Sequence, residues 1–140
     1  MAEELENKPV EAKPAENNAQ AEVTPEDVQN NKAFAILAYF WLLVLVPIFA
    51  AKESKFARFH ANQGLVLCIV ETAWWIINYI ITIALIHTLS WNTLWLLSLW
   101  GVIYWLVSVG ILVFAIIGIV NAAQGSVKPL PIFGKFKILK

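Results

Sequence analysis

Three long apolar runs dominate this chain and leave few folds open to it. They cover residues 33–51, 65–89 and 94–120, and Glu71 is the one charged side chain inside them. A helix rises about 1.5 Å per residue, so each run is long enough to cross a hydrocarbon core about 30 Å thick. We therefore predict an all-α integral membrane protein with three transmembrane helices.

The composition indicates a single membrane domain with polar ends. At 140 residues, with 59% apolar and 14% charged residues, the chain is too short for several domains and too apolar for an ordinary soluble one. Residues 1–32 contain eight acidic and three basic side chains, a net charge of −5. We divide the chain into a disordered acidic tail (1–32), a three-helix membrane domain (33–125) and a basic interfacial tail (126–140).

Two local signals refine the first part of the chain. Thr24 could cap a short helix that begins at Pro25, although a solvated turn fits the same residues. Pro47 lacks a backbone N–H and lies near the end of the first apolar run, where it predicts a bend rather than a break.

The distribution of basic residues predicts the topology. Seven of them follow residue 32, three in the segment 52–62 and four after residue 125. With three crossings these segments lie on one side, which the positive-inside rule assigns to the cytoplasm. We expect a multi-pass protein of the cell membrane, with its N-terminus outside and its C-terminus cytoplasmic. The residues expected to contact anionic lipid headgroups are Lys52, Lys55, Arg58, Lys128, Lys135 and Lys137.

A polar stripe on the second run is the first candidate site. Cys68, Glu71, Asn78 and Thr82 recur at helical spacing, on one face of a helix whose other faces are apolar. Ionisable groups inside a membrane usually mark a functional site. The alternative is packing, in which a protonated Glu71 hydrogen-bonds to a neighbouring helix. No lysine or arginine occurs in the three runs, so Glu71 has no basic partner there.

The sequence lacks the common catalytic and metal-binding motifs. No Gly-rich phosphate loop, H-E-x-x-H or G-x-S-x-G occurs. His60 and His87, the only two histidines, flank the second run and would lie about 40 Å apart along one helix. Cys68 is the only cysteine, so the chain cannot form an internal disulfide. We expect a protein that is not an enzyme, holds no metal or cofactor and binds no nucleic acid.

Two short motifs resemble a known family. Phe59-His60-Ala61-Asn62-Gln63-Gly64 opens the second run, and Gly118-Ile-Val-Asn121-Ala122-Ala-Gln124-Gly125, followed by Pro131, closes the third. Together they resemble the small, functionally uncharacterised prokaryotic membrane-protein family that is related to the twenty-kilodalton component of the chloroplast Tic translocon. The resemblance covers about residues 33–138. It implies that His60, Gln63, Asn121 and Gln124 act together at the cytoplasmic ends of neighbouring helices, where they could exchange hydrogen bonds.

Two functional hypotheses follow. In the first, the protein is a membrane interaction or protein-translocation-related subunit that binds other helices through the Glu71 stripe. In the second, a homo-oligomer forms a proton-linked or small-solute pathway lined by the same stripe. The expected partners are membrane lipids, further copies of the chain, or other membrane proteins.

Overall fold

The computed structural model describes residues 23–88, 90–91, 94–136 and 138–139, and every regular element within them is helical. The elements in order are α2 (Pro25–Leu37), the 3₁₀ helix η1 (Trp41–Val44), α3 (Leu45–Ala50), α4 (Lys55–His87), α5 (Leu94–Ala123) and the 3₁₀ helix η3 (Phe133–Lys135). The predicted all-α class is confirmed. The disorder predicted for residues 1–22 lies outside the described residues.

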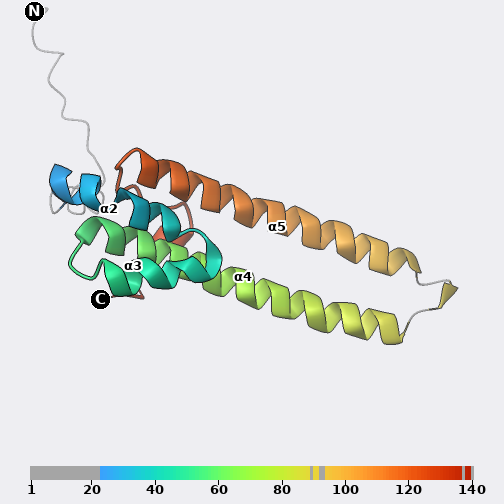
Figure 1. Cartoon of the computed structure of the whole chain (residues 1–140). Helices are drawn as coiled ribbons and strands as arrows, with labels where there is room; N and C mark the ends of the chain where they lie inside the picture. Colours follow the sequence, from blue (N-terminus) through green and yellow to red (C-terminus); the bar gives the residue numbers. More distant parts are fainter. Residues whose placement is uncertain (1–22, 89, 92–93, 137, 140) are drawn as a thin grey trace, which may run out of the picture.

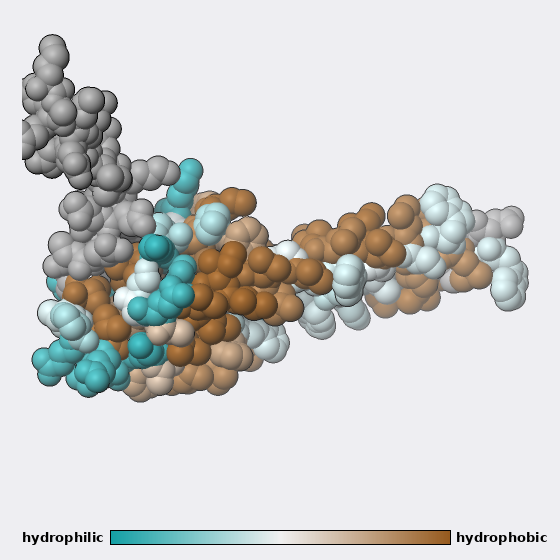
Figure 2. All heavy atoms as spheres, turned by 90° about the horizontal axis from the view of Figure 1, so that it is seen from above, coloured by the Kyte–Doolittle hydropathy of each residue, from teal (hydrophilic) through white to brown (hydrophobic). Residues whose placement is uncertain are grey.

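α4 and α5 form a long antiparallel hairpin (Figure 1). They contain 33 and 30 residues, which correspond to roughly 50 and 45 Å of helix. Both helices are long and apolar enough to cross a membrane. Most of their surface consists of exposed apolar side chains, which Figure 2 shows as a brown rod extending from the rest of the molecule. The hairpin supports a membrane protein, as the second and third apolar runs predict.

The first apolar run does not form the single helix expected over residues 33–51, and that expectation is wrong. α2 ends at Leu37, the chain turns, and η1 and α3 run back along α2 (Figure 1). Trp41 has a φ of 40°, which non-glycine residues rarely adopt, so the reversal is sharp. Pro47 lies in the first turn of α3, where its missing N–H breaks no helical hydrogen bond. The break therefore precedes the bend predicted at Pro47. We call residues 38–50 the re-entrant segment.

α2 begins inside the segment predicted to be disordered. Of the two alternatives for this segment, the structure has the helix, with Pro25 as its first residue. The hydroxyl of Thr24 accepts a hydrogen bond from the N–H of Asp27 at 3.2 Å. The predicted boundary of the disordered tail at residue 32 is therefore wrong for residues 25–32.

α2, the start of α4 and the end of α5 meet at one end of the hairpin, which we call the core end. Asp27 accepts a hydrogen bond from the N–H of Phe56 at 3.0 Å, which joins the start of α2 to the start of α4. The chain after α5 returns to the same end (Figure 1). The predicted topology put these segments on opposite sides. The structure instead places the start of α2 and the C-terminal tail at the same end of the hairpin, because the first run reverses between α2 and α3.

Small residues allow close packing at the core end. An added Cβ at Gly64 would collide with the carbonyl oxygen of Ala38, and one at Gly118 would collide with the ring of Tyr39. Tyr39 is therefore held between α4 and α5. The fully buried residues around it include Ala35, Ala38, Phe56, Ala57, Ala61 and Ala122.

Candidate functional site

His60 is fully buried at the core end, and both of its ring nitrogens have partners. Nε2 lies 3.0 Å from the carbonyl oxygen of Ser126, which can only accept, so Nε2 donates to it. In the neutral ring Nδ1 then accepts from the hydroxyl of Tyr39 at 2.9 Å. The rings of Phe56 and Phe59 lie edge-on, with centroids 4.9 and 5.3 Å from that of His60. His60 therefore joins α4 to the re-entrant segment and to the chain after α5.

Asn62 and Gln63 hold the C-terminal tail against α4. Gln63 Oε1 accepts from the N–H of Leu130 at 2.9 Å. Asn62 makes three hydrogen bonds to the tail: Nδ2 donates to the oxygen of Phe136 at 2.7 Å, and Oδ1 accepts from the N–H groups of Ile138 at 2.6 Å and Leu139 at 2.9 Å. We call Tyr39, His60, Asn62 and Gln63 the polar clamp. Three of its members bind main-chain groups, which is a structural role.

The structure brings together two of the four polar residues implied by the family resemblance. His60 and Gln63 both bind the tail, whereas the side chains of Asn121 and Gln124 hydrogen-bond to neither of them. Asn121 contributes its main-chain oxygen, which accepts from the N–H of Ser126 at 2.9 Å in the turn after α5. Gln124 is exposed. Sequence reasoning missed Asn62, although it lies inside the same motif as His60 and Gln63.

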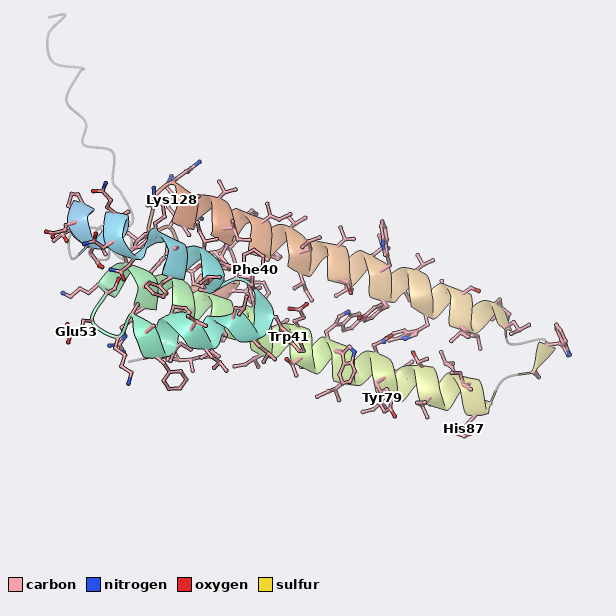
Figure 3. The ribbon with its side chains drawn as sticks, in the orientation of Figure 1. Phe40, Trp41, Glu53, Tyr79, His87 and Lys128 are labelled. Carbon is pink, nitrogen blue, oxygen red and sulfur yellow. The ribbon has the colours of Figure 1, made fainter. Side chains whose placement is uncertain are left out.

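Basic residues surround the core end. Figure 2 shows hydrophilic surface gathered there, and Figure 3 places Lys128 and Glu53 in the same region. Lys52 Nζ lies 5.7 Å from the centroid of the Phe49 ring, within cation–π range. Contact with lipid headgroups stays a prediction for these residues. The described ones, all exposed, are Lys52, Lys55, Arg58, Lys128 and Lys135, while Lys137 lies outside the described part of the chain.

Glu71 lies in an open groove between α4 and α5, which we call the Glu71 groove. Phe40 and Trp41, at the tip of the re-entrant segment, line it on the side of the core end (Figure 3). The carboxylate is exposed and makes no hydrogen bond or ion pair within the part of the chain that the structure describes. The groove has a volume of about 660 Å³, and its lining includes Glu71, Thr72, Trp75, Tyr104, Ser108 and Leu112.

Asn78 and Thr82 have partners inside the hairpin. Asn78 Oδ1 accepts from the indole N–H of Trp100 at 3.1 Å and from the hydroxyl of Thr82 at 3.4 Å. The bond from Trp100 joins α5 to α4 towards the far end, the turn after His87, whereas the bond from Thr82 lies within α4. The predicted stripe is therefore divided, because Asn78 and Thr82 serve the helix interface while Glu71 faces open space.

A second interhelical contact lies closer to Glu71. Trp74 stacks on Tyr104, with centroids 5.7 Å apart and ring planes 11° from parallel, and its indole N–H donates to Ser108 at 3.2 Å. Cys68 takes no part in this interhelical contact through the bond that it makes: its main-chain oxygen accepts from the hydroxyl of Thr72 at 2.7 Å, within α4. The groove is thus bordered by aromatic side chains whose positions are fixed by the hairpin.

The comparison with protein families decides what kind of chain this is. The MamF_MmsF model, described as the magnetosome magnetite crystal formation protein family, matches residues 30–137. The chain belongs to this family. Membership supports the small membrane-protein family that the motifs indicate, while the likeness to a Tic component stays an expectation. No curated protein and no solved structure matches the chain.

The part of the chain matched to the magnetosome family contains most of the features described above, although the start of α2 with Asp27, and Ile138 and Leu139 of the tail, lie outside it. It includes both long helices, the re-entrant segment, the polar clamp and the Glu71 groove, and the eight acidic residues of positions 1–32 precede it. Within the described residues, no three His, Cys, Asp or Glu side chains gather at metal-ligating positions. His60 lies at the core end and His87 near the far end of the same helix (Figure 3).

Proposed function

We propose that this chain is a non-enzymatic integral membrane protein that assembles with other membrane proteins, and that the Glu71 groove receives a transmembrane helix of the partner. The observation that carries the proposal is the exposure of Glu71, the one charged group within the apolar runs, on the wall of an open groove. The polar clamp has a separate task, since its hydrogen bonds hold the core end together.

The depth of Glu71 explains why the carboxyl group needs a partner. Sixteen residues separate it from His87, which corresponds to about 24 Å of helix and falls within a hydrocarbon core of about 30 Å that ends at His87. Glu71 therefore lies about 6 Å inside the boundary of the hydrocarbon core on the core-end side. Burying a charge there costs less than the roughly 2.5–3.5 kcal/mol found at the centre of a spanning helix, and charged groups inside a membrane normally pair with another protein group. A donor on a partner helix would offset this cost.

The groove lining defines the kind of helix that fits. Indole and phenol rings from Trp41, Trp74, Trp75 and Tyr104 offer broad apolar contact around the single carboxyl group. We infer a partner helix with small residues that allow close approach and with one hydroxyl, amide or amine donor opposite Glu71.

The alternative function, a pathway lined by the whole stripe, fits this geometry less well. It requires Asn78 and Thr82 to face a water-filled space. Both are instead engaged within the hairpin, where Trp100 donates to the same Asn78 oxygen that accepts from Thr82. Opening that space to water would break an interhelical hydrogen bond.

In-cell photo-crosslinking tests the helix-docking proposal. A photoreactive amino acid is placed at Trp75 or Leu112, which line the groove, and at the adjacent exposed positions Ile76 and Val113, which do not. We expect Trp75 and Leu112 to give adducts with another membrane protein at a yield several-fold above that from Ile76 and Val113. Glu71→Ala should abolish these adducts. Equal yields from all four positions, or adducts only with copies of this chain, would overturn the proposal.

The family description refers to the formation of magnetite crystals in magnetosomes. We propose that this chain contributes to that process as a membrane assembly subunit. In a host that forms such crystals, Glu71→Ala should alter the crystals and abolish the crosslinked partner together. If Glu71→Ala altered the crystals but left the crosslinked partner complex intact, the effect on the crystals would not depend on this assembly, which would contradict the proposal.

A further inference from the structure

The re-entrant segment carries a surface that the proposed function does not use. Val44 and Pro47 are buried against the core end, so one face of the segment packs on protein. The other face has no cover within the described residues, and its side chains are large and apolar. They are Leu42, Leu43, Leu45, Val46 and Phe49, with exposed fractions of 38–67%, whereas Phe40 and Trp41 line the Glu71 groove.

A hydrogen bond shows how far this segment reaches along the hairpin. The indole N–H of Trp41 donates to the hydroxyl of Thr72 at 3.4 Å. Fifteen residues separate Thr72 from His87, which corresponds to about 22 Å. A hydrocarbon core of about 30 Å that ends at His87 therefore extends about 8 Å beyond Thr72. In a core with this boundary, the tip of the re-entrant segment would enter the leaflet on the core-end side to a depth of about 8 Å and stop before the midplane.

The charges that follow the segment indicate that lipid covers its exposed face. Lys52 and Lys55 come directly after α3, and Lys52 Nζ lies 5.7 Å from the centroid of the exposed Phe49 ring. A ring below an ammonium group is the arrangement of side chains at the boundary between acyl chains and headgroups. These charges favour one leaflet of a bilayer with anionic headgroups as the cover.

This insertion makes the molecule wider in one leaflet than in the other. Figure 1 shows the re-entrant segment beside α4 and α5 at the core end only. In a bilayer placed as above, the near leaflet would therefore hold the segment as well as the two helices, and the far leaflet the two helices. We propose that the re-entrant segment is a one-leaflet wedge, and that the protein prefers bilayers whose convex leaflet faces the core end. Shallow apolar insertions bind best where bending has already spread the headgroups of their leaflet.

Membrane tubes pulled from giant vesicles test the wedge. The purified full chain carries a C-terminal peptide tag that is labelled from outside, so only molecules with an outward core end are seen. The vesicles contain phosphatidylcholine and phosphatidylserine. We expect the ratio of protein to lipid dye in the tube to exceed that in the vesicle and to rise as the tube narrows. A ratio that stays at unity for all tube radii would overturn the proposal.

Matched substitutions locate the effect. Leu42→Ser with Leu43→Ser removes apolar surface from the wedge, and Leu99→Ser with Val102→Ser removes a similar amount from α5 in the far leaflet; these residues are 57%, 46%, 49% and 55% exposed. The variant with both wedge substitutions should lose the enrichment of protein in the tube, and the variant with both α5 substitutions should keep it. An equal loss of enrichment in the two variants would contradict the wedge. If the variant with Leu42→Ser and Leu43→Ser does not fold, Phe49→Ser replaces it as the test of the wedge. The assay contains no partner protein, so its outcome is independent of helix docking.

Discussion

The hydroxyl of Tyr39 lies 2.9 Å from Nδ1 of His60, while the ring of the same tyrosine covers Gly118 on α5. One side chain thus ties the re-entrant segment to both long helices. Tyr39→Phe would leave Nδ1 of a fully buried imidazole without a donor, and we expect a loss of about 1–3 kcal/mol in the free energy of unfolding. Thermal unfolding in detergent measures it. The control is Tyr79→Phe, at an exposed tyrosine. An equal loss of unfolding free energy in this control would contradict the role assigned to the Tyr39 hydroxyl.

Gly64→Ala tests the close approach of α4 to the turn after α2. The new Cβ would meet the carbonyl oxygen of Ala38, which is backbone and cannot rotate away. We expect destabilisation of about 1–3 kcal/mol by overpacking. The same change at Gly101, where a Cβ meets nothing within 4 Å, should be neutral or stabilise the helix by up to about 1 kcal/mol. Two indistinguishable melting temperatures would argue against this packing.

Asn62→Ala should release the C-terminal tail while leaving the hairpin intact. The substitution removes the acceptor of the N–H groups of Ile138 and Leu139. Hydrogen exchange at these two amides should accelerate by at least tenfold, because their protection depends on that bond. Gln124→Ala is the control, since Gln124 is exposed. Unchanged exchange in Asn62→Ala would show that the tail is held by other contacts.

The reversal of the first apolar run predicts that the start of α2 and the end of α5 face the same side of the membrane. Single cysteines at Gln29, Lys128 and Trp91, in a Cys68→Ser background, can be labelled with an impermeant reagent in sealed, uniformly oriented vesicles. Gln29 and Lys128 should react from one side and Trp91 from the other. Labelling of Gln29 together with Trp91 would restore the three-crossing topology.

The all-α class and the two long helices could be predicted because they depend on local composition. Runs of apolar residues near 30 in length specify helices whatever surrounds them. The conformation of the first apolar run depends on contacts with residues that lie far along the chain. Its turn brings Ala38 onto Gly64 and Tyr39 onto His60, and the residues at the turn, Tyr39, Phe40 and Trp41, include no glycine, proline or charged residue that would have marked it in the sequence.

The candidate site was predictable in part for the same reason. Helical spacing placed Glu71, Asn78 and Thr82 on one face; Asn78 indeed accepts a hydrogen bond from Trp100 of α5, and Thr82 donates to the same Asn78 oxygen. Spacing along one helix cannot show where two helices separate, and the open groove at Glu71 exists because they do so beside the re-entrant tip. Asn62 and Gln63 bind main-chain atoms of the tail. Every residue has these main-chain atoms, so the sequence of the tail does not show that they are bound.

The hydrogen bond between His60 and Ser126 joins residues 66 positions apart, and this separation orders events during synthesis. When residues 33–51 leave the ribosome, the end of α5 and Ser126 have not been made, so the contacts that they provide do not yet exist. The first apolar run must therefore wait near the membrane surface while the hairpin is inserted. It can fold back only after the last helix is in place, which makes the N-terminal part of this chain the last to mature.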